Sequence, residues 1–357
     1  MSLKDRLRAE IAATGPISVA EFMARCLHDP QDGYYARHPR LGADGDFITA
    51  PLVSQMFGEL LGLWAIEVWD RLGRPAPFRL VEMGPGDGTL ITDALRAARL
   101  VPEFLQAAEL WLVETSAPLR ALQAQAIAPS GREATWVPSF GDVPAGAPLI
   151  LVANELLDCL PARQFVRTPQ GWAERRVGLD SEGELTFGLA PAPSGFLPPP
   201  GLETSPPGSI IEISPAQEAL GRAVGERIAC DGGAALFSDY GRARAEPGDT
   251  LQGLRAHRKL DPLEAPGDCD LTVHADFPAF ATAARAGKAA VTAIRTQAAF
   301  LQALGIEQRA AALARARPDR AEVIARQLER LIAPDQMGDL FKVVGVHTPG
   351  LAMPGFE

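Results

Sequence analysis

The stretch FRLVEMGPGDGTL, residues 78–90, decides the fold expected of this chain. Its first six residues form a short, mainly apolar run that ends at a glycine-rich turn, which is typical of a buried strand. The residues that follow, 89–100, have the spacing of a helix. A strand, a glycine turn and a helix in this order predict an α/β fold whose ligands bind beyond the carboxyl end of the strand.

Strands and helices alternate after this unit. The remaining predictions are strands at 110–114, 149–154, 234–241 and 341–347, and helices at about 116–127, 215–230, 275–287 and 296–333. Alternation of this kind predicts a mostly parallel sheet with helices on both faces.

Two regions depart from the alternation. Residues 1–75 are mainly helical in pattern and include a long, buried helix at about 54–72. Residues 162–190 are short alternating segments separated by turn residues, which predicts an antiparallel meander. We therefore expect an N-terminal helical and substrate-loop region over 1–75, and a core over 76–357 that carries the meander as an insertion at about 160–210.

The composition excludes several classes of protein. The chain has 357 residues, 47% of them apolar, and a net charge of −10, which argues against a nucleic-acid surface because such surfaces need clustered Lys and Arg. The four cysteines and five histidines form no CxxC or HExxH pattern, so no metal site is expected. There is no apolar run of about 18 residues that would predict a membrane span. The N-terminus lacks the apolar core of a signal peptide, so the cytoplasm is the expected location.

The spacing of the glycines predicts which ligand the turn holds. Gly84, Gly86 and Gly88 let the backbone approach a ligand without a Cβ in the way. Dinucleotide binders typically place the third glycine three positions after the second. Here it follows after two positions, and Glu82, just before the turn, can reach an ammonium group. This pattern favours S-adenosylmethionine over NAD, with a generic glycine-rich turn as the alternative.

Later strand ends supply polar side chains on the same side of the sheet. Glu114 is placed to accept hydrogen bonds from both ribose hydroxyls. Asp142, in the turn SFGDVP, is predicted to accept the adenine amino group, although aspartate is also a common turn cap. Asn154, Glu155 and Asp158 follow the next strand and should lie beside the transferred methyl group, with helix capping by Asn154 as the alternative.

Together, these motifs resemble the MidA family of class I methyltransferases. The resemblance rests on VEMGPGDGTL, NELLDCLP, GDFITAP with SQMFGE, SDYG, TLQG and DLTVHADF, which occur in consistent order from about residue 6 to residue 346. It implies a Rossmann-like class I fold with a seven-stranded, mostly parallel sheet, and S-adenosyl-L-methionine as the cofactor. From the mitochondrial members it also implies symmetric dimethylation of an arginine on a quinone-module subunit of respiratory complex I.

The same resemblance assigns residues to the substrate and to the chemistry. Because a guanidinium stays protonated, an arginine site needs carboxylates that hold the cation and accept a proton. Glu155 and Asp158 are the first candidates, and Asp46 or Asp276 could join them. The residues that the resemblance places at the substrate are Asp46, Phe47, Thr49, Tyr240, His274 and Asp276.

Other functions compete with this interpretation. An assembly chaperone that binds the cofactor with little turnover would have the same motifs. A small-molecule methyltransferase is also compatible, since substrate choice lies in loops. A nicotinamide-dependent oxidoreductase is disfavoured because the chain has no G-x-G-x-x-G at the turn. The sequence allows either a monomer or a homodimer.

Overall fold

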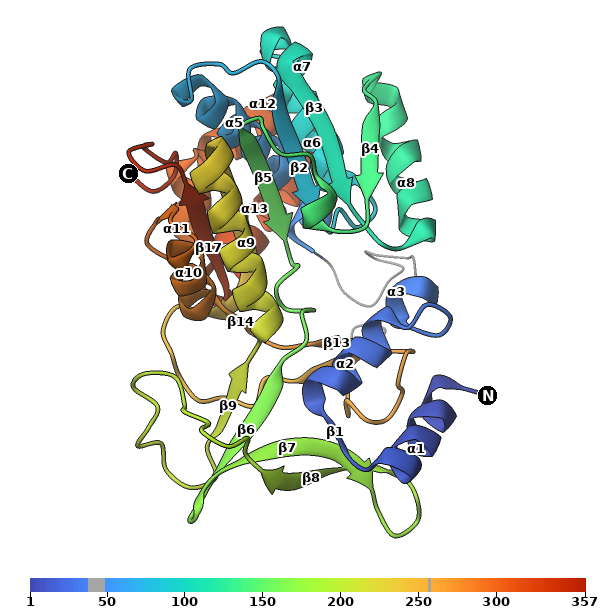
Figure 1. The fold of residues 1–357 in the computed structure, drawn as a ribbon. Coiled ribbons are helices and arrows are strands. Elements are labelled where there is room, and N and C mark those ends of the chain that lie inside the picture. Colours follow the sequence, from blue (N-terminus) through green and yellow to red (C-terminus); the bar gives the residue numbers. More distant parts are fainter. Residues whose placement is uncertain (38–48, 256–257) are drawn as a thin grey trace.

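The computed structural model describes residues 1–37, 49–255 and 258–357, and it contains a large mixed sheet (Figure 1). The main path through this sheet runs β15-β17-β10-β5-β2-β3-β4, and two further short strands, β14 and β16, pair with β10 and β17. The strands from β4 to β10 on this path are parallel, whereas β17 is antiparallel to β10. The α/β fold with a mostly parallel sheet of seven principal strands is therefore confirmed. The strands of this sheet are β2 (Phe78–Met83), β3 (Ala108–Val113), β4 (Ala134–Val137), β5 (Leu149–Asn154), β10 (Gly233–Arg242), β14 (Ala275–Asp276), β15 (Ala290–Val291), β16 (Arg295–Thr296) and β17 (Phe341–His347).

The sheet lies between two layers of helices because its central strands are apolar on both faces. In β5, Ile150 and Val152 pack in one hydrophobic cluster while Leu149, Leu151 and Ala153 pack in the other. This alternation follows from the two-residue period of a strand. The first cluster lies under α5 (Gln55–Arg71) and α6 (Thr89–Ala98), and the second under α9 (Pro215–Asp231) and α10 (Phe277–Ala286).

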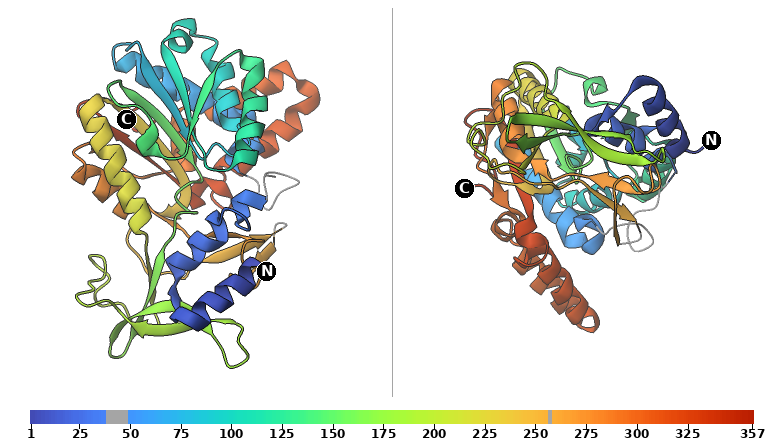
Figure 2. Two further views of the ribbon diagram at one scale, coloured as in Figure 1. Left: turned by 45° about the vertical axis from the view of Figure 1, so that its right-hand side comes forward. Right: turned by 90° about the horizontal axis from the view of Figure 1, so that it is seen from below.

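A smaller lobe of antiparallel strands lies at the other end of the molecule (Figures 1 and 2). Its meander strands pair in the predicted antiparallel way, and β1 pairs with β7. Helices α1 and α2 pack against this lobe through Leu3, Leu7, Ile11, Val19 and Phe22. The elements of the lobe are α1 (Leu3–Thr14), β1 (Ile17–Ser18), α2 (Val19–His28), α3 (Tyr34–Arg37), β6 (Arg163–Thr168), β7 (Gly171–Leu179), β8 (Leu185–Pro191), β9 (Ile210–Ile213), β11 (Gln252–Arg255), β12 (Arg258–Leu260) and β13 (Asp270–Thr272).

The N-terminal segment contributes to both lobes. Helices α1 and α2 belong to the small lobe, whereas α5 packs on the large sheet against α6. The predicted region 1–75 is thus divided in space between two layers, and its treatment as one domain stays a prediction.

The predicted helix at 296–333 is wrong in one respect, since it is broken into three. Gly305, with φ +88°, ends the first piece and starts the second, and Pro318 opens a short turn before the third. Glycine adopts this left-handed conformation readily, so it terminates a helix. The remaining helices are α4 (Ala50–Val53), α7 (Pro102–Ala107), α8 (Ala117–Ile127), α11 (Gln297–Ala303), α12 (Ile306–Ala316), α13 (Ala321–Ile332) and α14 (Met337–Leu340).

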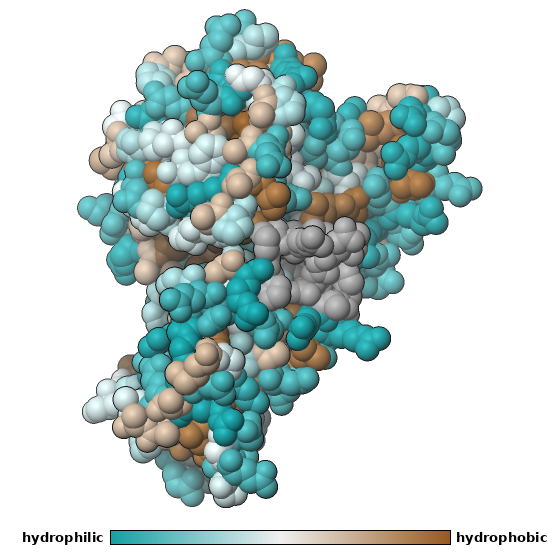
Figure 3. All heavy atoms as spheres, turned by 90° about the vertical axis from the view of Figure 1, so that its right-hand side faces the viewer, coloured by the Kyte–Doolittle hydropathy of each residue, from teal (hydrophilic) through white to brown (hydrophobic). Residues whose placement is uncertain are grey.

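The surface shown in Figure 3 is mainly hydrophilic, with apolar side chains scattered between polar ones. Among the described helices, none combines the length and apolar character that crossing a bilayer requires.

Candidate active site

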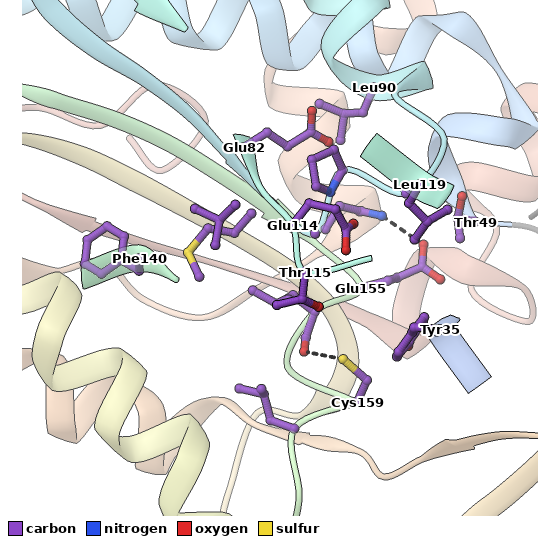
Figure 4. Close-up of a pocket in the computed structure, with 18 of the residues that line it drawn as sticks. Tyr35, Thr49, Glu82, Leu90, Glu114, Thr115, Leu119, Phe140, Glu155 and Cys159 are labelled. Atoms are coloured by element: carbon purple, nitrogen blue, oxygen red, sulfur yellow. Dashed lines mark hydrogen bonds between the residues drawn. The ribbon is translucent and has the colours of Figure 1, made fainter. Parts of the chain in front are cut away.

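A cavity of about 390 Å³ lies at the carboxyl ends of the parallel strands (Figure 4). Ligands of open α/β sheets bind at this edge because the loops after the strands leave a crevice there. Helices α3 and α4 contribute to the opposite wall. The residues that line it are His28, Tyr35, Thr49, Pro51, Leu52, Glu82, Met83, Gly84, Pro85, Gly86, Asp87, Leu90, Val113, Glu114, Thr115, Leu119, Pro138, Ser139, Phe140, Asn154, Glu155, Leu156, Cys159, Leu160, Ala216 and Leu220.

The glycine turn needs glycine at each predicted position. Gly84, Gly86 and Gly88 have φ values of +63°, +56° and +86°, which other residues adopt only with strain. Gly84 and Gly86 line the cavity, and a Cβ on Gly84 would lie 3.1 Å from Leu156 Cδ1. Gly88 does not line the cavity. It lies at the N-cap position of α6, so it shapes the turn without touching the ligand space.

Glu82 is a buried residue at the end of β2, and one of its carboxyl oxygens lacks a hydrogen-bond partner among the described residues. Its side chain is 3% exposed, and Oε2 has no hydrogen-bond partner among the described residues. Burial, reinforced by the nearby charge of Asp87, raises the pKa of Glu82 to about 8. A cation that approached this oxygen would supply both the missing partner and the compensating charge. The ammonium group of a methionine moiety fits that need.

Glu114 lies directly after β3, where its carboxylate is held on both oxygens. Oε1 accepts a hydrogen bond from the Ser116 amide at 2.7 Å, and Oε2 accepts one from Gln123 Nε2 at 3.2 Å. Burial raises the pKa of Glu114. These bonds fix the side chain at the edge of the cavity, and the predicted contact with the ribose stays a prediction.

The part of the cavity lining that lies next to Asp142 in the sequence is formed by Pro138, Ser139 and Phe140. Asp142 does not belong to this lining. Its exposed carboxylate caps the turn, accepting hydrogen bonds from Ser139 Oγ at 2.6 Å and from the Ser139 amide at 3.2 Å. The turn-capping alternative is therefore the one that the structure contains, and the predicted adenine contact has no support from this geometry.

Glu155 faces the cavity from the end of β5 in a strained conformation. Its φ is +51°, which is uncommon for a residue with a side chain, and the Glu155 amide donates to Ser238 O at 2.9 Å. Oε1 accepts hydrogen bonds from Asn154 Nδ2 at 2.9 Å and from the Ala50 amide at 3.2 Å. Burial, followed by the charge of Asp158, raises the pKa of Glu155 to about 8.

Asp158 lies behind this site and does not line the cavity. Burial raises its pKa to about 6, opposed by a hydrogen bond with the Tyr240 side chain. Asp239, which belongs to the SDYG motif but received no predicted role, is fully buried beside it. Its Oδ2 accepts hydrogen bonds from the Leu157 amide at 2.7 Å and the Asp158 amide at 3.2 Å. Asp239 thus holds the turn that presents Glu155, and the predicted direct catalytic role of Asp158 is not supported by its position.

The residues predicted at the substrate are divided by the structure. Thr49 lines the cavity at the start of α4. Asp46 and Phe47 lie outside the described residues.

The other three predicted substrate residues do not reach the cavity. The Tyr240 ring packs edge-on against His274 and Phe341, with ring centroids 5.7 and 5.6 Å apart. Asp276 caps α10, where its Oδ1 accepts a hydrogen bond from the Ala279 amide at 3.0 Å. These side chains pack against one another or cap a helix and do not line the cavity, so their predicted contact with the substrate stays a prediction.

The sequence did not indicate the contribution of Tyr35. This residue of α3 lines the cavity, and its carbonyl oxygen accepts a hydrogen bond from Ser116 Oγ at 2.8 Å. Burial raises the pKa of the Tyr35 hydroxyl. The only signal was an aromatic pair after Gly33, and an aromatic residue is more often part of a core.

The family of the chain follows from a match that spans most of this architecture. A family model described as "Putative S-adenosyl-L-methionine-dependent methyltransferase" matches residues 60–295, which include the glycine turn and all four cavity-lining acids, Glu82, Asp87, Glu114 and Glu155. The chain belongs to this family of methyltransferases. The expected reaction class and cofactor are thereby confirmed.

Full-length relatives agree with the assignment. This methyltransferase is 35% identical over 397 residues to the mitochondrial protein arginine methyltransferase NDUFAF7 of Rattus norvegicus, with 98% of this chain and 89% of the relative covered. It is 37% identical to the NDUFAF7 homolog of Drosophila melanogaster, with 98% and 85% covered.

A solved structure resembles the whole methyltransferase, including both lobes. The protein, from Burkholderia thailandensis, was crystallised with S-adenosyl-homocysteine bound. It is 29% identical, has a TM-score of 0.85, and the similarity covers 99% of this chain and 92% of that one.

Proposed function

We propose that this methyltransferase transfers the methyl group to the guanidinium of an arginine in a protein. The observation that carries the proposal is a pair of hydrogen-bond acceptors at the end of β5. Asn154 Nδ2 donates to Glu155 Oε1, so Asn154 Oδ1 is the atom left buried without a partner among the described residues. The hydrogen bonds to Glu155 within the described ranges all reach Oε1, and Oε2 remains available toward the cavity.

A guanidinium matches these acceptors. It carries five N–H donors in a planar fork and no acceptor, so it can satisfy a carboxylate and an amide oxygen together. Its positive charge also offsets the cost of ionising the buried Glu155 carboxyl group, whose pKa is raised to about 8. Each charge-assisted hydrogen bond of this kind contributes about 1.5–3 kcal/mol.

The chemistry requires positioning and one proton acceptor. S-adenosylmethionine, when bound, would supply an electrophilic methyl group, whose bond to sulfur breaks as the acceptor nitrogen bonds to carbon, so that S-adenosylhomocysteine leaves. Glu82, the glycine turn and Glu114 would hold it, with Glu155 on the acceptor side. Glu155 orients the nucleophilic nitrogen and accepts its proton as the new N–C bond forms, and alignment alone contributes roughly 7–11 kcal/mol. Leu156 and Leu160 give the cavity apolar walls near Glu155.

The test compares Glu155→Gln with Glu322→Gln, an exposed acid on α13. Each protein is incubated with methyl-labelled S-adenosylmethionine and two synthetic peptides that differ only in arginine or lysine. We expect label in methylarginine after acid hydrolysis, a loss of at least about 100-fold in Glu155→Gln, and no loss in the control.

Retention of S-adenosylhomocysteine affinity by Glu155→Gln would separate an effect on the acceptor from a damaged cofactor site. Label in lysine, or full activity of Glu155→Gln, would overturn the proposal. Cofactor binding and a stable protein complex without methylated product would instead indicate an assembly chaperone, and label confined to small molecules a small-molecule methyltransferase.

We extend the proposal to the finer features that the family resemblance implies. These are symmetric dimethylation and a target on a quinone-module subunit of respiratory complex I, or on a related protein. Mass spectrometry of the modified arginine distinguishes symmetric from asymmetric dimethylation. The rat and fly relatives are named mitochondrial, so the cytoplasmic location expected for this chain remains a proposal that cell fractionation would test.

A further inference from the structure

A buried glutamine connects the two halves of the cofactor site. Gln123, on α8, has no exposed surface. Its Nε2 donates to Gly86 O in the glycine turn at 2.8 Å and to Glu114 Oε2 at 3.2 Å. One amide nitrogen therefore joins the turn that follows β2 to the acid that follows β3.

Trp136 fixes which way this amide points. The indole Nε1 donates to Gln123 Oε1 at 2.8 Å, and an indole N–H can only donate. The oxygen of the amide must therefore face Trp136, and its two N–H groups must face Gly86 and Glu114. Both N–H donors and one lone pair of the amide oxygen are therefore used, and a flipped amide would place its oxygen against the Gly86 and Glu114 oxygens and its nitrogen against the Trp136 N–H.

The backbone around Gln123 leaves little room for this arrangement to shift. A Cβ added to Gly88 would lie 3.2 Å from Gln123 Cα and 3.3 Å from Ala126 Cβ. Helix α8 thus packs directly on the end of the glycine turn, where any displacement of the helix would move the turn as well.

We propose that Gln123 is a positioning residue that uses the glycine turn as an anchor to hold Glu114 in the arrangement that contacts the ribose hydroxyls of the cofactor, and that Trp136 orients it. Gln123 does not line the cavity, so it acts through Glu114 and Gly86. The proposal depends on Glu114 contacting the ribose hydroxyls, and it is independent of the identity of the methyl acceptor.

The test measures binding to two ligands by calorimetry. The ligands are S-adenosylhomocysteine and its 2′,3′-dideoxy analogue, which lacks the hydroxyls that Glu114 would bind. The variants are Gln123→Met, which keeps the volume but removes both donors, and Gln125→Met, an exposed glutamine on the same helix that serves as the matched control. We expect Gln123→Met to weaken binding of S-adenosylhomocysteine by at least tenfold and binding of the dideoxy analogue by less than threefold.

Two further variants test whether Gln123 acts through Glu114. The double variant Glu114→Gln with Gln123→Met should bind no more weakly than Glu114→Gln alone, because both changes remove one contact. If Gln123→Met does not fold, Trp136→Phe takes its place, since it leaves Gln123 intact but removes the donor that orients it. We expect the same preference for weakening the hydroxylated ligand. Equal losses for both ligands, full additivity in the double variant, or unchanged affinity would overturn the assignment.

Discussion

Cofactor affinity should depend strongly on pH because of Glu82. The carboxyl group is buried and its pKa is raised to about 8, so it is neutral through most of the range in which the protein would be studied. An ammonium group binds well only to the ionised form. The ionised fraction is about 1% at pH 6, about 9% at pH 7 and about one half at pH 8, which follows from a pKa of about 8.

These fractions set the size of the effect. The observed affinity for S-adenosylhomocysteine should rise about 50-fold between pH 6 and pH 8, equivalent to about 2.3 kcal/mol. The ligand ammonium stays protonated across this interval, so the change reports the protein. Binding at pH 7 should also release about 0.9 proton as Glu82 ionises.

Isothermal titration calorimetry in buffers of different ionisation enthalpy measures both quantities. Glu82→Gln should bind weakly and lose the pH dependence. Glu155→Gln is the matched control, because Glu155 also has a pKa raised to about 8 but lies on the acceptor side, so this variant should keep the slope. Affinity that is independent of pH in the unmodified protein, or a slope that persists in Glu82→Gln, would refute the reasoning.

Three other perturbations follow from the same geometry. Glu82→Gln should raise the free energy of unfolding, measured by chemical denaturation, by up to a few kcal/mol at pH 8 and by little at pH 4. The reason is that a carboxyl group whose pKa in the folded protein is raised from 4.5 to about 8 destabilises the fold as the pH rises through that interval. Asp239→Ala should lower the free energy of unfolding by about 2–6 kcal/mol, since two buried amides lose their acceptor. Steady-state assays should show a fall in turnover that is larger than the loss of cofactor affinity. An unchanged melting temperature would contradict this prediction. Gly84→Ala should weaken cofactor binding, because φ +63° and the 3.1 Å approach to Leu156 both oppose a side chain. Adding Leu156→Ala should restore only the part of the affinity that is lost to the steric contact. Full affinity in Gly84→Ala alone would count against the assignment.

The sequence predicted the elements whose signals are local. The strand at Phe78–Met83 and the turn after it were identified because apolar runs and glycine spacing directly reflect backbone requirements. Glu82, Glu114 and Glu155 were found because each stands at or just beyond a strand end, and parallel strands end on one edge of the sheet.

The sequence predicts less where a side chain's surroundings depend on packing between distant segments. Asp158 is near Glu155 in sequence, but the turn directs it away from the cavity and toward Tyr240. Asp276 and Asp142 were expected to contact ligands, yet each is used by the backbone amides of its own turn or helix. No periodicity indicates which of these competing uses a carboxylate will have.

The hydrogen bond from Ser116 Oγ to Tyr35 O spans the boundary between the lobes, only two residues after the acid assigned to the ribose. This hydrogen bond therefore connects α3 of the small lobe to the segment that carries Glu114. A protein that binds the small lobe and shifts α3 would disturb this hydrogen bond and so lower the affinity for the cofactor. Conversely, a bound cofactor would restrict the motion of α3 and of the surface that such a partner contacts. The affinity for the protein substrate and the affinity for the cofactor should therefore depend on each other.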